Sequence, residues 1–234
     1  MMTGHTQIAV VTGGSTGLGK EIARLLLDRN IPTCIVSRRS EALEAALNEF
    51  PENGAMRISF QGDVSNAQDV KRLAFYLQEK NCSAKWLFNN AGQGFFSPLQ
   101  EITDPQIESM FGANLLGVVL MTREFIEQII SNEGTICNIM STASLVGKAK
   151  ETVYCAAKWG ARGFTEALRV ELKDKPVKVI AVYPGGMNTP FWDTDDLVNP
   201  VSFMPPENVA QLITANIFDA VDCQVLDFTI KQLP

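Results

Sequence analysis

The 234-residue sequence predicts an α/β fold in which a doubly wound parallel β-sheet carries helices on both faces. Three observations lead to this prediction. Short β-branched runs alternate with longer stretches, the runs are apolar at nearly every position, and the longer stretches repeat apolar residues every three or four positions. Near-continuous apolar strands are typical of parallel sheets buried on both faces, and a strand–helix–strand order implies right-handed crossovers.

Seven runs are predicted to be strands, because each combines β-branched or aromatic residues with few charges. A parallel sheet built from them would place the carboxyl ends of the strands at one edge, where ligands bind in folds of this kind. In chain order the runs are QIAVVT at 7–12, TCIVS at 33–37, MRISF at 56–60, WLFNN at 86–90, GTICNIM at 134–140, KVIAVYP at 178–184 and QVLDF at 224–228.

The stretches between the strands show the helical period. Crossover helices of this kind connect parallel strands and cover the faces of the sheet. The predicted helices are GKEIARLLLDRN at 19–30, SEALEAALNEF at 40–50, SNAQDVKRLAFYLQEK at 65–80 and TVYCAAKWGARGFTEALRVELKD at 152–174, with a further apolar helix beginning near Phe111.

The chain is predicted to form one domain over residues 1–234, because it has no internal repeat, low-complexity linker or break in composition. One long irregular segment, PGGMNTPFWDTDDLVNPVSFMPPEN at 184–208, is dense in Pro, Asn and Asp. Long loops inside compact domains are commonly functional, so residues 186–208 are predicted to form a lid over a binding site.

Composition excludes several classes of function. The net charge of −6 and the pI near 4.9 argue against binding to nucleic acid or to anionic membranes, which need clustered Lys and Arg. No signal peptide is predicted, and no strictly apolar run is long enough for a membrane span. His5 is the only histidine, which removes Ser-His-Asp catalysis and most zinc chemistry, and no metal site is predicted.

The five cysteines are an odd number and lack CxxC spacing. Cys34 and Cys137 lie inside strand-like apolar runs, where a cysteine is usually a small buried hydrophobe. We therefore expect an intracellular, cytoplasmic protein whose thiols are reduced.

A glycine-rich turn follows the first predicted strand. In TGGSTGLGK, Gly13, Gly17 and Gly19 have the spacing G-x-x-x-G-x-G, and a helix begins near Leu18. Glycines let the backbone turn sharply and approach a pyrophosphate, while the helix N-terminus supplies N–H donors and a positive dipole. The turn predicts a dinucleotide site on a Rossmann-like sheet.

The second strand ends without the acidic residue that usually holds the ribose 2′-hydroxyl of NAD. Ser37, Arg38 and Arg39 stand there instead, in CIVSRRSE. A guanidinium suits a 2′-phosphate through bidentate, charge-assisted hydrogen bonds, so NADP(H) is favoured over NAD(H) as the cofactor. The alternative is that both arginines are only the solvated start of the next helix.

Two tyrosine–lysine pairs share a spacing of four residues: Tyr154 with Lys158 in TVYCAAKWG, and Tyr76 with Lys80 in AFYLQEK. Residues four apart lie on one face of a helix, so either lysine would place a positive charge beside a phenol. Such a charge lowers the pKa of a tyrosine from about 10 and improves it as an acid–base catalyst at neutral pH. Spacing alone leaves both pairs open.

Taken together, the motifs resemble the short-chain dehydrogenase/reductase family over nearly the whole chain. TGGSTGLG resembles the TGxxxGxG cofactor loop of that family, NNAG its NNAG element, and YPGGMNTPF its PG motif. Ser141 stands thirteen residues before Tyr154, which is the family's serine-to-tyrosine spacing, whereas Asp63 stands thirteen before Tyr76. The resemblance therefore selects Tyr154 and its lysine as the reactive pair.

The resemblance implies an oxidoreductase that moves a hydride between a nicotinamide and a carbon bearing oxygen. Tyr154 would exchange the proton, and Lys158 would lower its pKa and hold the nicotinamide ribose. Ser141 would orient the substrate oxygen. Asn114 would anchor a water chain leading to Lys158. The four implied catalytic residues are Asn114, Ser141, Tyr154 and Lys158.

The resemblance also extends the set of cofactor-binding residues. Asp63 and Val64 would contact the adenine, and Thr189 would hold the nicotinamide carboxamide. The complete set is Gly13, Ser15, Thr16, Gly17, Leu18, Gly19, Ser37, Arg38, Arg39, Asp63, Val64, Asn90, Ala91, Gly92, Tyr154, Lys158, Pro184, Gly185, Met187 and Thr189.

The expected substrate pocket is mainly apolar, which favours a hydrophobic ketone or secondary alcohol as the small-molecule partner. One alternative is a 3-oxoacyl-carrier-protein reductase, which would need a basic patch for its carrier, and Lys148 and Lys150 are the candidates. Another is a non-catalytic nucleotide-binding sensor, because a fold alone does not imply turnover. The pocket residues are Gln93, Phe95, Phe96, Leu145, Val146, Met187, Phe191 and Trp192.

Assembly into a homodimer or homotetramer is a further implication of the resemblance. In the family, the helices that begin near Phe111 and Thr152 pair across a dimer axis. Here FGANLLGVVLM and GARGFTEALRV carry wide apolar surfaces, which fits such pairing.

Overall fold

The computed structural model of the protein describes residues 4–193, 199–220 and 222–233. These residues form a seven-stranded sheet in the order β3-β2-β1-β4-β5-β6-β7, and every neighbouring pair is parallel. The predicted doubly wound α/β fold is thereby confirmed. The order of strands reverses between β1 and β4, so a crevice is expected at the carboxyl ends of those two strands.

All seven predicted runs overlap a strand, and the largest differences are at the starts of β4 and β7. β4 begins at Cys82, four residues earlier than predicted, and this added segment pairs with β1. The prediction missed it because the polar residues Ser83 and Lys85 interrupt its apolar pattern. β7 begins later than predicted. The strands are β1 Thr6–Thr12, β2 Thr33–Ser37, β3 Arg57–Gln61, β4 Cys82–Asn89, β5 Thr135–Ile139, β6 Lys178–Pro184 and β7 Asp227–Ile230.

The helices differ from the prediction in two places. The helix expected near Phe111 begins earlier, at Asp104, where Thr103 and Gln106 form a capping box. Helix α7 was not predicted, because Pro205 and Pro206 made its start look irregular, although proline suits a first helical turn. The helices are α1 Gly17–Asp28, α2 Ser40–Glu49, α3 Ala67–Glu79, α4 Asp104–Phe111, α5 Gly117–Ser131, α6 Thr152–Glu171 and α7 Pro206–Phe218, with a π-helical turn at Gly112–Leu116.

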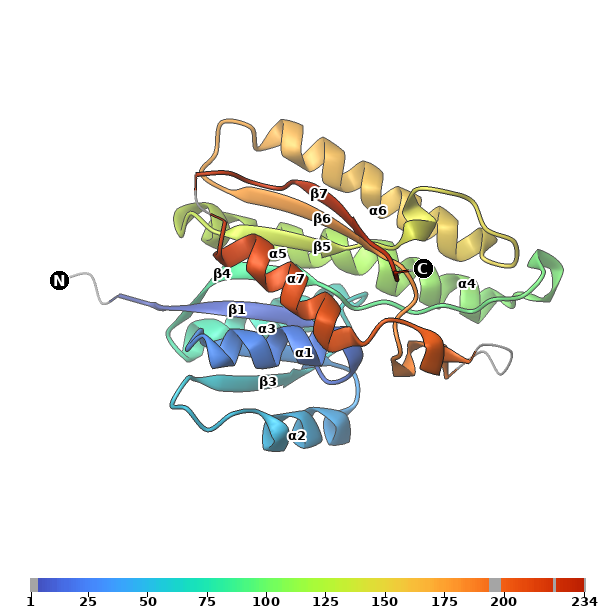
Figure 1. Ribbon diagram of the computed structural model, residues 1–234. Coiled ribbons are helices and arrows are strands. Elements are labelled where there is room, and N and C mark those ends of the chain that lie inside the picture. Colours follow the sequence, from blue (N-terminus) through green and yellow to red (C-terminus); the bar gives the residue numbers. More distant parts are fainter. Residues whose placement is uncertain (1–3, 194–198, 221, 234) are drawn as a thin grey trace.

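The helices form one layer on each side of the sheet (Figure 1). Helices α1, α2 and α7 pack on one face, and α3, α5 and α6 on the other. Along β1, Ala9 and Val11 face the first layer, whereas Ile8 and Val10 face the second. This alternation buries both faces of the central strand and explains its continuous apolar sequence.

α4, the π-helical turn and α5 form one continuous helical stretch, Asp104–Ser131. Contrary to the expectation from strictly apolar runs, this stretch is long and apolar enough to cross a membrane by length and composition, with a mean hydropathy of 1.2. Half of its apolar window is buried inside the protein, as is typical of a core helix.

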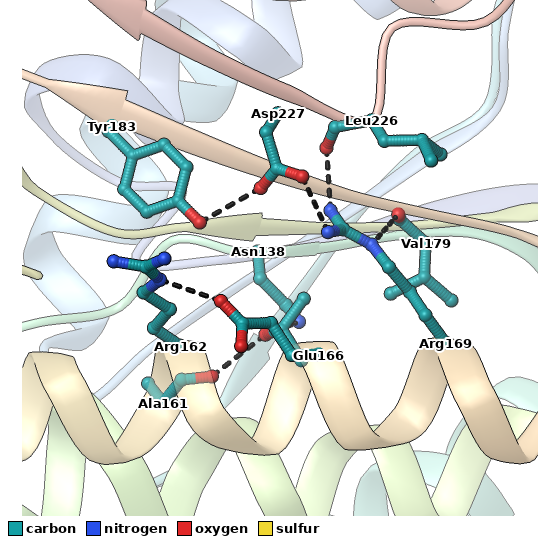
Figure 2. A network of polar contacts seen from close by, with 10 residues as sticks. Asn138, Ala161, Arg162, Glu166, Arg169, Val179, Tyr183, Leu226 and Asp227 are labelled. Carbon is teal, nitrogen blue, oxygen red and sulfur yellow. Dashed lines mark hydrogen bonds and ion pairs between the residues drawn. The ribbon is translucent and has the colours of Figure 1, made fainter. Parts of the chain in front are cut away.

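A polar network holds the short last strand in place (Figure 2). Asp227 of β7 accepts hydrogen bonds from Arg169 Nη1 at 2.6 Å and from Tyr183 Oη at 2.9 Å. The same guanidinium donates to the carbonyl oxygens of Val179, at 2.8 Å, and Leu226, at 2.6 Å. Burial, together with the bond to Asp227, raises the pKa of Tyr183 to about 12. The network therefore ties β7 to both β6 and α6.

Candidate active site

A cleft of about 770 Å³ opens at the carboxyl ends of the strands, over the crevice between β1 and β4. Its walls come from the turns after β1, β2, β3, β4 and β5, from the start of α6 and from the loop after β6. Of the predicted cofactor-binding residues, all but Gly19 line this cleft. The sequence therefore identifies one site, although its residues lie up to 176 positions apart, from Gly13 to Thr189.

The glycine-rich turn has the backbone that its sequence predicts. Gly13 and Gly17 have φ values of +63° and +53°, in the left-handed region that favours glycine. A Cβ atom on Gly19 would lie 2.3 Å from the carbonyl oxygen of Gly13. Gly19 thus acts behind the cleft surface by allowing α1 to begin directly beneath the turn.

Thr12 was not among the predicted site residues, yet it joins the two turns that border the cofactor end of the cleft. Its hydroxyl oxygen accepts hydrogen bonds from the backbone N–H of Asn90, at 2.9 Å, and of Ala91, at 3.0 Å. In return, Asn90 Nδ2 donates to the carbonyl oxygens of Thr12 and Gly13. The threonine of TGGSTGLGK was the available signal, because it precedes the first glycine.

The end of the cleft near β2 is basic. Arg38 and Arg39 are exposed and line the cleft, and neither forms an ion pair within the described part of the chain. Ser15 Oγ donates to Ser37 Oγ at 2.9 Å, which joins the glycine-rich turn to the end of β2. This end of the cleft suits a phosphorylated dinucleotide. The glycine-rich backbone lets a phosphate come close, a helix N-terminus lies beside it, and the two guanidinium groups have no ion-pair partner among the described residues.

Asp63 and Val64, the expected adenine contacts, lie in the turn after β3 and line the same end of the cleft. Asp63 Oδ1 accepts hydrogen bonds from the backbone N–H of Ser65, at 2.8 Å, and from its hydroxyl, at 2.7 Å. These contacts fix the turn, so the carboxylate shapes this wall.

Ser141, Tyr154 and Lys158 meet at the middle of the cleft. Ser141 follows β5 and begins a short 3-10 turn, where its Oγ accepts from Ala143 N at 3.1 Å. Tyr154 and Lys158 lie on α6, 6% and 4% exposed. Lys158 Nζ lies 5.9 Å from the centre of the Tyr154 ring and donates to the carbonyl oxygen of Ile139 at 3.0 Å.

The pKa of Tyr154 differs from the expectation. Burial raises it above the ordinary value, a hydrogen bond with Ser141 acts in the opposite direction, and the charge of Glu151 raises it further. Lys158 is not among the groups that shift the pKa of Tyr154 in this structure, and its ammonium donates to the carbonyl oxygen of Ile139 instead. Burial lowers the pKa of Lys158 to about 8. In this structure Tyr154 is therefore a phenol, a proton donor, at neutral pH.

Asn114 lies beneath the cleft, fully buried in the π-helical turn. Its Nδ2 donates to the carbonyl oxygens of Gln93, at 2.7 Å, and Met110, at 2.9 Å, while its Oδ1 has no hydrogen-bond partner among the described residues. A Cβ atom on Gly92 would lie 2.7 Å from that oxygen and 3.8 Å from Lys158 Nζ. Glycine thus leaves space between an unpaired acceptor and the lysine, in keeping with the expected water chain.

The second tyrosine–lysine pair lies outside the cleft. Tyr76 is on α3 and Lys80 is the C-cap residue of that helix, and neither is among the described residues that line the cleft. Lys80 Nζ lies 4.8 Å from the centre of the Tyr76 ring, and that ring packs against Phe60 at 5.6 Å. This pair is part of a helix surface.

Aromatic side chains form the wall beside Tyr154. The Phe96 ring meets the Tyr154 ring edge-on at 5.5 Å, and the Phe191 ring lies 5.8 Å from it. Trp192 packs 5.3 Å from Phe96, and its indole N–H donates to the carbonyl oxygen of Met187 at 2.9 Å. These residues give the substrate end of the cleft the apolar character that was expected.

Three of the expected pocket residues lie elsewhere. Phe95 packs into the apolar cluster that contains Met110, and Leu145 packs against Met140. Val146 is exposed. Because the segments after β4 and β5 are irregular, the direction of each side chain there could not be predicted from alternation along a strand. Gln93, Phe96, Met187, Phe191 and Trp192 do line the cleft.

The predicted lid, 186–208, is described except for residues 194–198. Its two ends are joined, because Asn188 N donates to Met204 O at 2.9 Å and Met204 N to Gly186 O at 3.3 Å. Short 3-10 turns occupy Pro190–Trp192 and Pro200–Ser202, and α7 takes over at Pro206. The described part of the lid contributes Phe191 and Trp192 to the cleft.

Several polar residues that line the cleft were not predicted. They belong to α4, whose start was placed too late, and to positions that no motif marks. Lys148 was considered only for a carrier protein. The missed polar lining residues are Ser65, Glu108, Ser109, Glu151 and Asp193.

Comparison with known proteins agrees with this geometry. Residues 7–197 match the family described as short chain dehydrogenase. The chain is 30% identical to the sepiapterin reductase of Chlorobaculum tepidum, covering 89% of each chain, and 32% identical to a 3-oxoacyl-[acyl-carrier-protein] reductase of Synechocystis, covering 88% of this chain and 87% of the relative. A metagenomic short-chain oxidoreductase solved with NADP superposes with a TM-score of 0.82 at 27% identity, covering 98% of this chain and 99% of that one.

Proposed function

The chain belongs to the short-chain dehydrogenase/reductase family, and we propose that this oxidoreductase uses NADP(H) to interconvert a carbonyl and a secondary alcohol on a hydrophobic substrate. The observation that carries the proposal is the position of Tyr154. It lies with Ser141 and Lys158 in the middle of one cleft, between a basic end suited to phosphates and an aromatic end suited to an apolar substrate.

The nicotinamide, when bound, supplies or accepts the hydride. Ser141 and Tyr154 hold the substrate oxygen between their hydroxyl groups, because both line the cleft and the serine is close enough to shift the pKa of the tyrosine. Tyr154 then gives its proton to that oxygen during reduction. Its raised pKa keeps it protonated at neutral pH, which suits the direction from carbonyl to alcohol.

Lys158 returns the proton to Tyr154. Its lowered pKa, about 8, makes the ammonium group an effective proton donor near neutral pH. The space left by Gly92 places the unpaired Oδ1 of Asn114 close enough for a bridging water, which supports resupply from outside the cleft.

The preference for NADP(H) rests on Arg38 and Arg39. A second, non-catalytic interpretation is weaker, because a buried tyrosine and a buried lysine are costly to retain without a use for them. The reductase acting on carrier-bound substrates is also weaker. Glu151 pairs with Lys148, and Asp193 adds a further carboxylate beside the aromatic wall, so the substrate end has no basic patch for an acidic carrier among the described residues.

We further propose that the protein assembles through α5 and α6. Large apolar side chains are exposed along this side, on the π-helical turn and its neighbours and on α6. Several exposed large apolar side chains on neighbouring helical segments are typical of an interface between subunits. The residues are Phe111, Leu116, Trp159 and Val170.

A cytoplasmic location is proposed from the cysteines. All five are free thiols, and Cys34, Cys82, Cys137 and Cys155 are buried. Unpaired thiols persist where the compartment is reducing.

The cofactor assignment is tested by titrating the protein with NADPH and with NADH, following energy transfer from tryptophan to the nicotinamide. We expect NADPH to bind at least about tenfold more tightly, and Arg38→Ala to remove most of that difference, since charge-assisted bonds of this kind are worth about 1.5–3 kcal/mol. Arg72→Ala, an exposed arginine outside the cleft, is the matched control.

Equal affinities for the two nucleotides would overturn the NADP(H) preference and leave the oxidoreductase assignment in place. Failure to bind either would contradict the proposed function itself. Oxidation of NADPH by a panel of aryl ketones then tests the carbonyl chemistry directly, through the loss of nicotinamide absorbance.

A further inference from the structure

Glu151 has no part in the proposed proton transfer, yet it belongs to the reaction end of the cleft. It precedes Tyr154 by three residues, which places the two on the same side of the start of α6. Its side chain lines the cleft and is only 18% exposed. The carboxylate is near enough for its charge to raise the pKa of Tyr154.

This carboxylate is incompletely compensated by the protein. Among the described residues its ion-pair partner is Lys148, with Nζ 3.7 Å from Oε2, and that lysine side chain is 37% exposed. An ion pair of this length, with the lysine exposed to solvent, contributes little. Burial meanwhile raises the pKa of Glu151, so water has been removed from the carboxylate without a strong partner in return. A donor on a bound ligand would supply the missing interaction.

The surroundings of Glu151 favour a positively charged donor. The wall formed by Phe96, Phe191 and Trp192 stands at the same end of the cleft, and aromatic faces attract cations. Asp193, which follows Trp192 directly, adds a second carboxylate beside this wall, whereas Arg38 and Arg39 lie in the turn after β2, at the cofactor end. The charge of the cleft thus changes sign between its two ends.

We propose that Glu151 is a specificity-determining residue that selects carbonyl substrates bearing a protonated amine next to an apolar, ring-sized body. The inference rests on the proposed function of the same cleft. In this arrangement the carbonyl oxygen lies between Ser141 and Tyr154, the apolar body contacts the aromatic wall, and the ammonium donates to Glu151.

Three ketones of nearly the same shape test this inference. Para-(dimethylaminomethyl)acetophenone is a cation, para-isobutylacetophenone is its neutral isostere, and para-acetylphenylacetate is an anion. With NADPH, we expect the kcat/KM of the cation to exceed that of the isostere by about tenfold or more, mainly through KM, and the anion to be the poorest.

Variants assign the preference to one side chain. Glu151→Gln should lower the ratio of cation to isostere at least about tenfold, toward unity, whereas Lys148→Gln should raise it, because the competing ammonium is gone. Glu171→Gln is the matched control, since it removes an exposed carboxylate from the same helix outside the cleft. Titration with NADPH checks that each variant is folded; Glu151→Asp replaces Glu151→Gln if the latter fails that check, and should keep the preference in weakened form.

The outcomes separate this inference from the proposed function. If the isostere is reduced as efficiently as the cation, or if the preference survives in Glu151→Gln, the inference is wrong while the proposed function stands. Reduction of none of the three ketones by a protein that binds NADPH would overturn both. A preference that Lys148→Gln reduces would also contradict it, because the lysine would then be part of the recognition.

Discussion

The two tyrosine–lysine pairs have the same spacing and opposite surroundings. In the pair on α3, Lys80 Nζ lies 4.8 Å from the centre of the Tyr76 ring; in the pair on α6, Lys158 Nζ lies 5.9 Å from that of Tyr154. The surface pair is thus the closer one. Any two residues four apart on a helix lie close together, so this proximity says nothing about reactivity.

Placement distinguishes the pairs. Tyr76 packs on Phe60 at the outer surface, where Arg72 also lies 5.5 Å from the Phe60 ring. Tyr154 is buried at the carboxyl edge of the sheet beside Ser141. The topology supplies a serine on a neighbouring strand end to one pair only, so the chemistry depends on the sheet and not on the helix motif.

The largest expected effect of this difference is on turnover. Tyr154→Phe removes the transferred proton and keeps the ring, so kcat should fall by about 10³, within the range known for general acid–base catalysis. Tyr76→Phe is the same substitution on the surface and should leave kcat unchanged. The measurement is NADPH oxidation with a ketone of the panel, alongside NADPH affinity. Comparable losses in the two variants would contradict the distinction between the pairs.

The residues thirteen positions before each tyrosine give the next effect. Ser141→Ala should lower kcat by about 10² and leave NADPH affinity nearly intact, because one hydroxyl that orients the substrate oxygen is lost. Asp63→Ala should show the reverse pattern, since Asp63 holds the turn after β3 at the cofactor end. Steady-state kinetics and nucleotide titration of both variants make the comparison. A loss of kcat at constant affinity in Asp63→Ala would show that the sequence spacing had been assigned the wrong meaning.

Features set by the backbone were predictable from sequence. These features depend on particular residue types, such as Gly13 at a φ of +63°. They are the glycine-rich turn, the apolar strands and the contact between the turns after β1 and β4. The alternation of strands and helices then fixed the edge of the sheet at which these turns meet.

Features that depend on side-chain direction and burial could not be predicted from the sequence. Whether Phe95 or Phe96 faces the cleft depends on an irregular segment without a period. Glu151 matches no motif, because its role depends on what lies across the cleft. The pKa of Tyr154 was predicted with the wrong sign, since the sequence shows Lys158 nearby but not how deeply both groups are buried.

The smallest of these effects concerns stability and follows from the burial of Lys158. Its pKa falls from the ordinary 10.5 to about 8 in the folded protein, so between those values the unfolded chain binds more protons than the native state. The free energy of unfolding contributed by this lysine must then rise with pH across that window. From about pH 7 to about pH 9.5, wild type should gain about 2 kcal/mol relative to Lys158→Met.

The difference between the two proteins is the quantity to measure, by urea unfolding at both pH values. Buried thiols such as Cys34 and Cys137, whose pKa values are raised, lower stability with rising pH, but they do so equally in wild type and variant. Lys80→Met is the control, because it removes an exposed ammonium group that also lies beside a tyrosine ring. It should change the free energy of unfolding by less than about 1 kcal/mol at either pH. A pH-independent difference for Lys158→Met would mean that the lysine keeps its charge despite burial, and the buried pair would then owe its reactivity to a cation beside the phenol, as the helix spacing first indicated.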